Sequence, residues 1–163
     1  MILRAVVALV IVTGAATAWA TVQTMPGVEN PARARQNWIL KCQGCHRADA
    51  TGTAATPPAM AGQISRFLSV PAGRDYLARV PGVATAALND VELAELLNWS
   101  LLRFDPVHLP ADFQPYTSAE VGKLRGSPLR TDAAEIRARI MVDLEKRSGP
   151  STPGQEQVER LQR

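Results

Sequence analysis

Cysteine and histidine are scarce in this sequence, which has two of each among its 163 residues. It also lacks internal repeats and β-rich segments, and no stretch after residue 20 is apolar enough to cross a membrane. The formal net charge is only +3, and the positive charges are scattered along predicted helices opposite acidic residues. This pattern is typical of a solvated surface and gives no support for nucleic acid as a partner. The length suits one domain and is short for two.

Residues 1–20 have the features of a secretory leader. Arg4 gives a short positive start, residues 5–18 are apolar or small, and Ala18-Trp19-Ala20 has the small-x-small pattern of a signal peptidase site. We therefore expect cleavage after Ala20 and a periplasmic protein, whose formal charge falls from +3 to +2 because Arg4 is removed. The alternative is an uncleaved leader that contacts the membrane, although its apolar stretch is short for a bilayer.

The remaining sequence predicts helices and loops. A cap at Asn30 and apolar spacing indicate a helix at 32–41, and short helices are expected at 63–68 and 73–80. Asn89 and Glu92 can form a capping box at the start of a strong helix at 89–104. The first of these is expected to bury Ala34, Trp38 and Ile39. The predicted parts are the leader 1–20, a lead-in 21–29, a domain 30–104, a helical extension 105–147 and a disordered tail 148–163.

The extension is predicted to contain two helices. Thr117 and Glu120 can cap a short helix that stops at Gly126, and Asp132 with Glu135 can cap a second one. This second helix places an apolar stripe on one face, formed by Ile136, Ile140 and Leu144. Such a stripe needs a cover, which is either the domain before it or a partner protein.

Both cysteines and one histidine lie together in Cys42-Gln43-Gly44-Cys45-His46. Cys-x-x-Cys-His is the signature for covalent attachment of haem c. Thiols three residues apart on a helical turn can reach the two vinyl groups of one porphyrin, and the adjacent histidine can then bind the iron. We therefore expect Cys42 and Cys45 to form thioether bonds and His46 to be the proximal iron ligand.

Three other interpretations of the motif fit the sequence less well. A thioredoxin-like redox pair needs a preceding strand and an α/β pattern, whereas this motif follows a predicted helix. A zinc site needs four donors, and the adjacent Cys45 and His46 are awkward to bring onto one tetrahedral metal. A local disulfide leaves His46 unexplained.

From about residue 30 to 104 the chain resembles class I monohaem cytochromes c. The resemblance rests on the helix that enters Cys42, the loop Pro57-Pro58-Ala59-Met60-Ala61-Gly62, and the capped helix at 89–104 with Trp99 at a position where the family often has an aromatic residue. It implies a small all-α cytochrome c-like domain around one covalent haem, followed here by a helical extension. The first and last helices of the domain are expected to cross above the haem.

The sequence departs from this family where the sixth iron ligand is expected. Class I proteins supply a methionine just before the last helix, but this chain reads Arg79-Val80-Pro81-Gly82-Val83 there, and valine cannot bind iron. Met60 is one candidate, although its position is one where the family usually places a packing leucine. His108 is a weaker candidate, because it follows the last helix of the domain. A five-coordinate or water-bound iron is the remaining option.

The resemblance implies an electron carrier that is not an enzyme and that exchanges single electrons with redox proteins, for example a periplasmic dehydrogenase. Two alternatives stay open at this stage. An open distal site would suit a ligand-binding or peroxidase-type haem protein. The extension 105–147 could instead dock the chain into a larger oxidoreductase complex.

Overall fold

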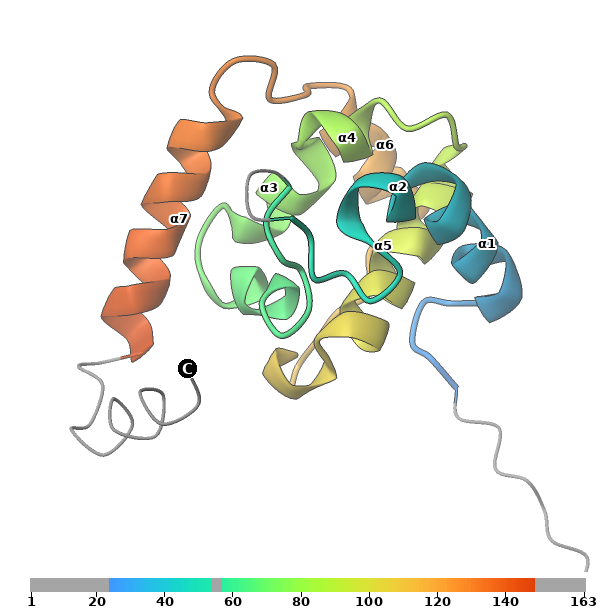
Figure 1. Cartoon of the computed structure of the whole chain (residues 1–163), viewed down its shortest axis with the longest axis horizontal. Helices are drawn as coiled ribbons and strands as arrows, with labels where there is room; N and C mark the ends of the chain where they lie inside the picture. The colour runs from blue at the N-terminus through green and yellow to red at the C-terminus, as the bar shows by residue number, and fades with distance from the viewer. Residues whose placement is uncertain (1–23, 54–56, 149–163) are drawn as a thin grey trace, which may run out of the picture.

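The computed structural model describes residues 24–53 and 57–148, and these form helices, turns and loops without a strand (Figure 1). The predicted all-α fold is therefore confirmed for this part of the chain. The predicted leader and the predicted tail after residue 148 lie outside the described residues. The elements are α1 (Pro31–Lys41), α2 (Gln43–His46), η1 (Ile64–Ser69), α3 (Gly73–Arg79), α4 (Pro81–Ala84), α5 (Asp90–Phe104), η2 (Pro106–His108), α6 (Ser118–Arg125) and α7 (Ala133–Ser148).

Helix α1 begins as its sequence predicts. The Asn30 side chain accepts a hydrogen bond from the Arg33 backbone N–H, and a proline occupies the first turn. Ala34 and Trp38 are buried, as expected, but the prediction for Ile39 is wrong because its side chain is 40% exposed. Successive residues on a helix are turned by about 100° from one another, so the residue after Trp38 leaves the buried face.

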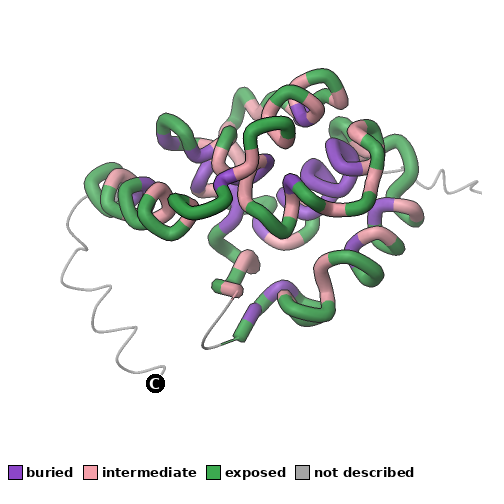
Figure 2. Tube along the Cα trace, turned by 90° about the horizontal axis from the view of Figure 1, so that it is seen from above, coloured by how far each residue is buried: buried purple, intermediate pink, exposed green. Residues whose placement is uncertain are grey.

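Helix α5 is the centre of the fold. Asn89 and Glu92 form the predicted capping box, and the helix ends at Phe104 as predicted. Its pattern predicts one apolar face, yet every residue from 93 to 101 is buried (Figure 2). The reason is that α1 packs against one side of α5, while α6, η1 and η2 pack against others.

Two buried polar side chains of α5 tie distant segments to it. Glu95 is 3% exposed, and its carboxylate accepts hydrogen bonds from the Asn30 N–H at 2.7 Å and from the Arg33 Nε at 2.8 Å. This carboxylate therefore joins the start of α1 to the middle of α5. Buried charges are tolerated only where partners of this kind compensate for lost hydration.

The second such side chain is Asn98, which is fully buried. Its Nδ2 donates to the carbonyls of Gly27 and Tyr116, each at 3.0 Å, and its Oδ1 accepts from the Tyr116 N–H at 2.7 Å. Gly27 has φ +70, and a Cβ there would meet Asn98 Nδ2 at 2.5 Å. One amide thus fastens both the lead-in and the extension to α5.

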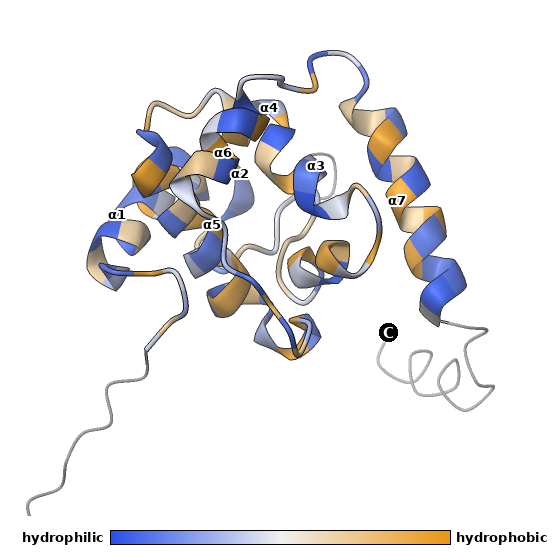
Figure 3. Cartoon of the chain, turned by 180° about the vertical axis from the view of Figure 1, so that it is seen from behind, coloured by the Kyte–Doolittle hydropathy of each residue, from blue (hydrophilic) through white to orange (hydrophobic). Residues whose placement is uncertain are grey.

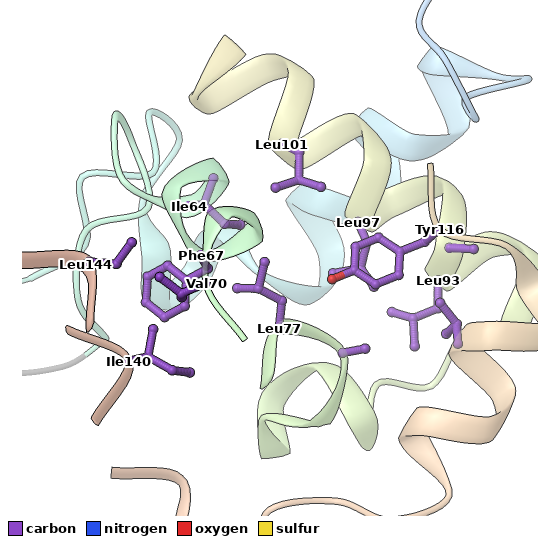
Figure 4. Packing of buried hydrophobic residues seen from close by; sticks show 13 residues of the cluster. Ile64, Phe67, Val70, Leu77, Leu93, Leu97, Leu101, Tyr116, Ile140 and Leu144 are labelled. Carbon is purple, nitrogen blue, oxygen red and sulfur yellow. The ribbon is translucent and has the colours of Figure 1, made fainter. Parts of the chain in front are cut away.

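The extension packs into the same core as the residues before it. Figure 4 shows Ile140 and Leu144 from α7 beside Phe67 and Val70, with Tyr116 beside Leu97. Along α7 the apolar residues gather on one face, as the colouring in Figure 3 shows, and this face contacts η1 and α3. The main core consists of Ile64, Phe67, Val70, Leu77, Ala78, Leu93, Ala94, Leu97, Leu101, Tyr116, Val121, Ile140 and Leu144. The apolar stripe of α7 is therefore covered within the chain, by this main core.

If α7 stabilises the domain, replacing Ile140 by alanine should be far more costly than replacing Val142. Ile140 is 2% exposed and Val142 is 47% exposed on the same helix. Ile140→Ala should lower the free energy of unfolding by about 2–5 kcal/mol. Val142→Ala should change it by no more than about 0.5 kcal/mol. Urea unfolding followed by circular dichroism measures both, and equal effects would mean that α7 does not depend on this core.

Candidate functional site

Helices α1 and α2 present the Cys-x-x-Cys-His motif on one helical turn. The Cys42 N–H donates to the Trp38 carbonyl at 2.9 Å, so α1 leads directly into the motif. The N–H groups of Cys45 and His46 both donate hydrogen bonds to the Cys42 carbonyl, at 3.2 and 3.0 Å. Arg47 then adopts φ 65 and ends the turn. This is the helical arrangement that the spacing of the motif predicts.

The two thiols have different surroundings and are not joined in a disulfide. Cys42 is partly buried. Its burial raises the pKa of its thiol to about 11, and the nearby Cys45 contributes a smaller part of this rise. Cys45 is exposed, and a Cβ built at the adjacent Gly44 would meet nothing within 4 Å. One sulfur therefore lies toward the interior and the other at the surface. A flat group bound to both would be held with one edge near solvent.

Unpartnered buried nitrogen atoms gather beside this motif. In the described residues, the buried side-chain polar atoms without a hydrogen-bond partner are Asn37 Nδ2, Trp38 Nε1 and His46 Nδ1, all within one short stretch. Buried polar groups normally have partners, so such a cluster indicates a site that another group completes. The chemistry of the donors agrees with haem, because it combines two thiols and an imidazole.

His46 is suited to bind a metal. Burial lowers the pKa of its imidazole, which favours the neutral ring that can act as a ligand. Its ring centroid lies 5.9 Å from that of Trp38. Trp38 in turn contacts Phe104 at a centroid distance of 4.5 Å and Trp99 at 6.2 Å, so the wall beside His46 is aromatic.

Two groups of apolar side chains meet at Met60 and Leu88, and one of them contacts the motif. The first is the main core, and the second is the Trp38 cluster, which consists of Ala34, Trp38, Ala50, Leu96 and Trp99. Met60 and Leu88 are partly buried and pack against both groups, while Cys42 packs against the Trp38 cluster. A porphyrin held by Cys42 would be covered by these side chains and shielded from water. We call this place the haem seat.

Met60 belongs to a loop that returns to His46. Its N–H donates to the Ala50 carbonyl at 2.9 Å, and the Ala61 N–H donates to the same carbonyl at 3.1 Å. The Gly52 N–H donates to the His46 carbonyl at 3.0 Å, so this loop is hydrogen-bonded to the motif itself. The structure thus brings Met60 to the haem seat, next to the segment that follows His46.

His108 is held in its own turn after α5. Its Nδ1 lies 2.6 Å from the Asp105 Oδ1, and the buried Asp105 also accepts a hydrogen bond from the Ser65 N–H at 2.9 Å. Figures 1 and 3 place the turn that follows α5 at the lower end of the view, away from α2. The contact of His108 with Asp105 is therefore a local one, between the last residue of η2 and the residue that precedes it.

The segment 79–83 contains no side chain that can bind iron. Pro81 starts the short helix α4, and Val80 precedes it as the N-cap residue. Val83 packs against the main core. A four-residue helix carries no periodic pattern, which is why the sequence did not predict α4.

Zinc and thioredoxin-like chemistry find no support in the part of the chain that the structure describes. No group of three or more His, Cys, Asp or Glu side chains lies close enough to hold a metal ion, within residues 24–53 and 57–148. The motif also follows a helix and no strand. Within the same ranges, no helix is long and apolar enough to cross a membrane.

Comparison with known proteins supports the interpretation of the motif. The chain is 30% identical over 107 residues to cytochrome c-552 of Thermus thermophilus, a match that covers 55% of this chain and 82% of that protein. A second cytochrome c-552 sequence from the same organism is also 30% identical over 107 residues, and 72% of it is covered. No protein-family model and no solved structure matches the chain. With its all-α fold and these relatives, the chain belongs to the c-type cytochromes, which carry covalently bound haem c and transfer electrons.

Proposed function

We propose that this protein is a periplasmic monohaem cytochrome of the class I type that passes single electrons between redox proteins. The observation that carries the proposal is the helical turn of Cys42, Cys45 and His46, set beside unpartnered buried nitrogen atoms and an apolar seat. The cysteines form the two thioether bonds and His46 is the proximal ligand. When bound, haem c supplies a one-electron Fe(III)/Fe(II) couple. The periplasmic location rests on the predicted leader, which is cleaved after Ala20.

The residues around the seat set the conditions for electron exchange. Trp38, Met60 and Leu88 exclude water from the interior side, which limits the reorganisation that accompanies a change of charge. Cys45 and Gly44 are exposed, so the edge of the haem that lies beside them would be open to a partner. No substrate pocket is needed for this function, because electrons leave and enter through that edge.

The sequence around the motif is rich in positive charge. Residues 30–47 contain Arg33, Arg35, Lys41 and Arg47 but no acidic residue; Glu95 pairs with Arg33, and Asp49 lies near Arg47. Leu40 lies beside them with a side chain that is 65% exposed. Exposed apolar surface rimmed by charge is typical of a transient docking site. We infer that the redox partners, such as a periplasmic dehydrogenase, present acidic residues around their own exit site for electrons.

For the iron we propose that Met60 packs against the haem and does not bind it from the distal side. Its backbone is hydrogen-bonded to Ala50 in the loop that follows His46, which supports a position on the proximal wall. His108 already pairs with Asp105, and this contact supports a structural role for it.

One observation favours a second function. The segment 79–83, where the family carries its methionine ligand, leads from α3 into α4 and has no side chain that can bind iron, and its Val83 packs against the main core. An iron left with His46 alone would bind small ligands, so a ligand-binding or peroxidase-type protein is the second candidate. A carrier would bind added ligands slowly, because the protein screens its iron from them, so the rate of CO binding to the ferrous protein separates the two functions.

Covalent attachment predicts a simple result for cysteine variants. In a denaturing gel stained for haem, the exported wild-type protein should keep its haem, and the variant with both Cys42→Ser and Cys45→Ser should lose it. Each single variant should retain haem through one thioether, with a shifted α-band in the pyridine haemochrome spectrum because one vinyl group stays unsaturated. A double variant that still carries haem on the gel would contradict the assignment.

The role of Met60 is tested by Met60→Leu, which keeps the size of the side chain and removes the sulfur. We expect the ferric spectrum and the rate of CO binding to the ferrous protein to change little. Loss of a methionine-to-iron charge-transfer band in this variant would show that Met60 is the sixth ligand. Rapid CO binding by the wild-type protein would instead favour the second function.

Charge reversal tests the docking face. Arg35→Glu with Lys41→Glu should lower the rate of haem reduction by a small anionic reductant by about tenfold at low salt, and added salt should remove the difference. The matched control is Arg130→Glu with Arg147→Glu, which changes the net charge equally on exposed positions of the extension. Stopped-flow absorbance measures the rates. Equal effects of the two pairs would show that net charge alone matters and that this face has no special role.

A further inference from the structure

Arg125, near the end of α6, makes an unusual number of contacts to one short segment. Its guanidinium donates to the carbonyls of Ala84 at 3.0 Å, Ala86 at 2.6 Å and Leu88 at 2.8 Å. It also donates to the Asp90 carboxylate at 3.1 Å. The side chain is only 18% exposed. All of these acceptors lie between the end of α4 and the first residue of α5.

The surface of α6 is shaped for this contact. Gly122 lies one turn before Arg125 on the same helix face, and a Cβ at Gly122 would lie 2.5 Å from the Asp90 Oδ2. The absence of a side chain there lets α5 begin close to α6. The planar guanidinium can then reach several acceptors at once, which the single ammonium group of lysine cannot do.

The segment 84–90 borders the haem seat. Leu88 packs against both the main core and the Trp38 cluster, and Ala86 packs against the main core. The preceding residues 79–83 offer no iron ligand, so no bond to the metal holds this part of the chain in place. Its position depends on contacts within the protein. The hydrogen bonds of its backbone N–H groups and of Thr85 and Asn89 are local, whereas Arg125 donates four hydrogen bonds to it from α6.

We propose that Arg125 is a positioning residue that keeps the segment 84–90 closed beside the haem seat and so restricts the access of small ligands to the iron. In class I proteins a methionine–iron bond would restrain this segment. Here one arginine of the extension provides the restraint. The inference rests on the proposed attachment of haem at Cys42 to His46, and it does not depend on electron transfer.

The test compares Arg125→Met and Arg125→Lys with Arg130→Met in the exported holoprotein. Arg125→Met keeps an apolar stem and removes every hydrogen bond, whereas Arg125→Lys keeps the charge and one donor group. Arg130 is exposed and serves as the control. The rate at which imidazole, a small neutral iron ligand, binds to the ferric protein is measured by absorbance. Amide hydrogen exchange is followed in residues 84–90.

We expect Arg125→Met to bind imidazole about tenfold faster than the wild type and to exchange the amides of 84–90 about tenfold faster, because local opening becomes easier. Both rates should be intermediate in Arg125→Lys, and both should equal the wild-type rates in Arg130→Met. An unchanged rate of imidazole binding in a folded Arg125 variant overturns the proposal. If Arg125→Met does not fold, the rate measured for Arg125→Lys tests the proposal. A haem-stained denaturing gel reports failure of the attachment separately, because it does not depend on Arg125.

Discussion

The contact between α1 and α5, closed by the buried Glu95 carboxylate, is the constraint on which the rest of the structure depends. Glu95 accepts hydrogen bonds from the first residues of α1, and this contact fixes where that helix begins on α5. A helix advances about 1.5 Å per residue, so its start also determines where its last turn lies. That last turn carries Trp38 onto Trp99 and delivers Cys42 to the haem seat. The ion pair between Arg33 and the buried Glu95 thereby positions the Cys-x-x-Cys-His motif.

A second constraint comes from the extension. Helix α5 is buried all round, and α1 can cover only one of its sides. The extension covers another side through α6, and the buried Asn98 fastens it by exchanging two hydrogen bonds with the Tyr116 backbone. Arg74 adds a bidentate pair with Glu120, in which hydrogen bonding to Arg74 lowers the pKa of the Glu120 carboxyl. The haem seat and the extension therefore share one core.

Local signals predicted most of the helices, while long-range contacts did not show in the sequence. The caps at Asn30, Asn89 and Thr117 were correctly predicted because a capping side chain and its partner lie within one helical turn. Glu95 and Asn98 carried no such signal, since a polar residue on a helix is ordinarily solvated. Their burial follows from helices that approach from elsewhere in the chain. The same reason explains why Arg125 looked like an ordinary cation in the last turn of a helix.

The local sequence was enough to predict how haem c is attached, because two thiols and an imidazole within five residues form an arrangement that any helical turn provides. It also determined the all-α class, through capping and apolar spacing. The surroundings of the motif could be learned only from the folded chain. It joined the loop of Met60 to the residues after His46, paired His108 with Asp105, and brought Arg125 to the segment 84–90. The contacts of Arg125 join residues far apart in the sequence, and only packing of the whole chain around α5 brings them together.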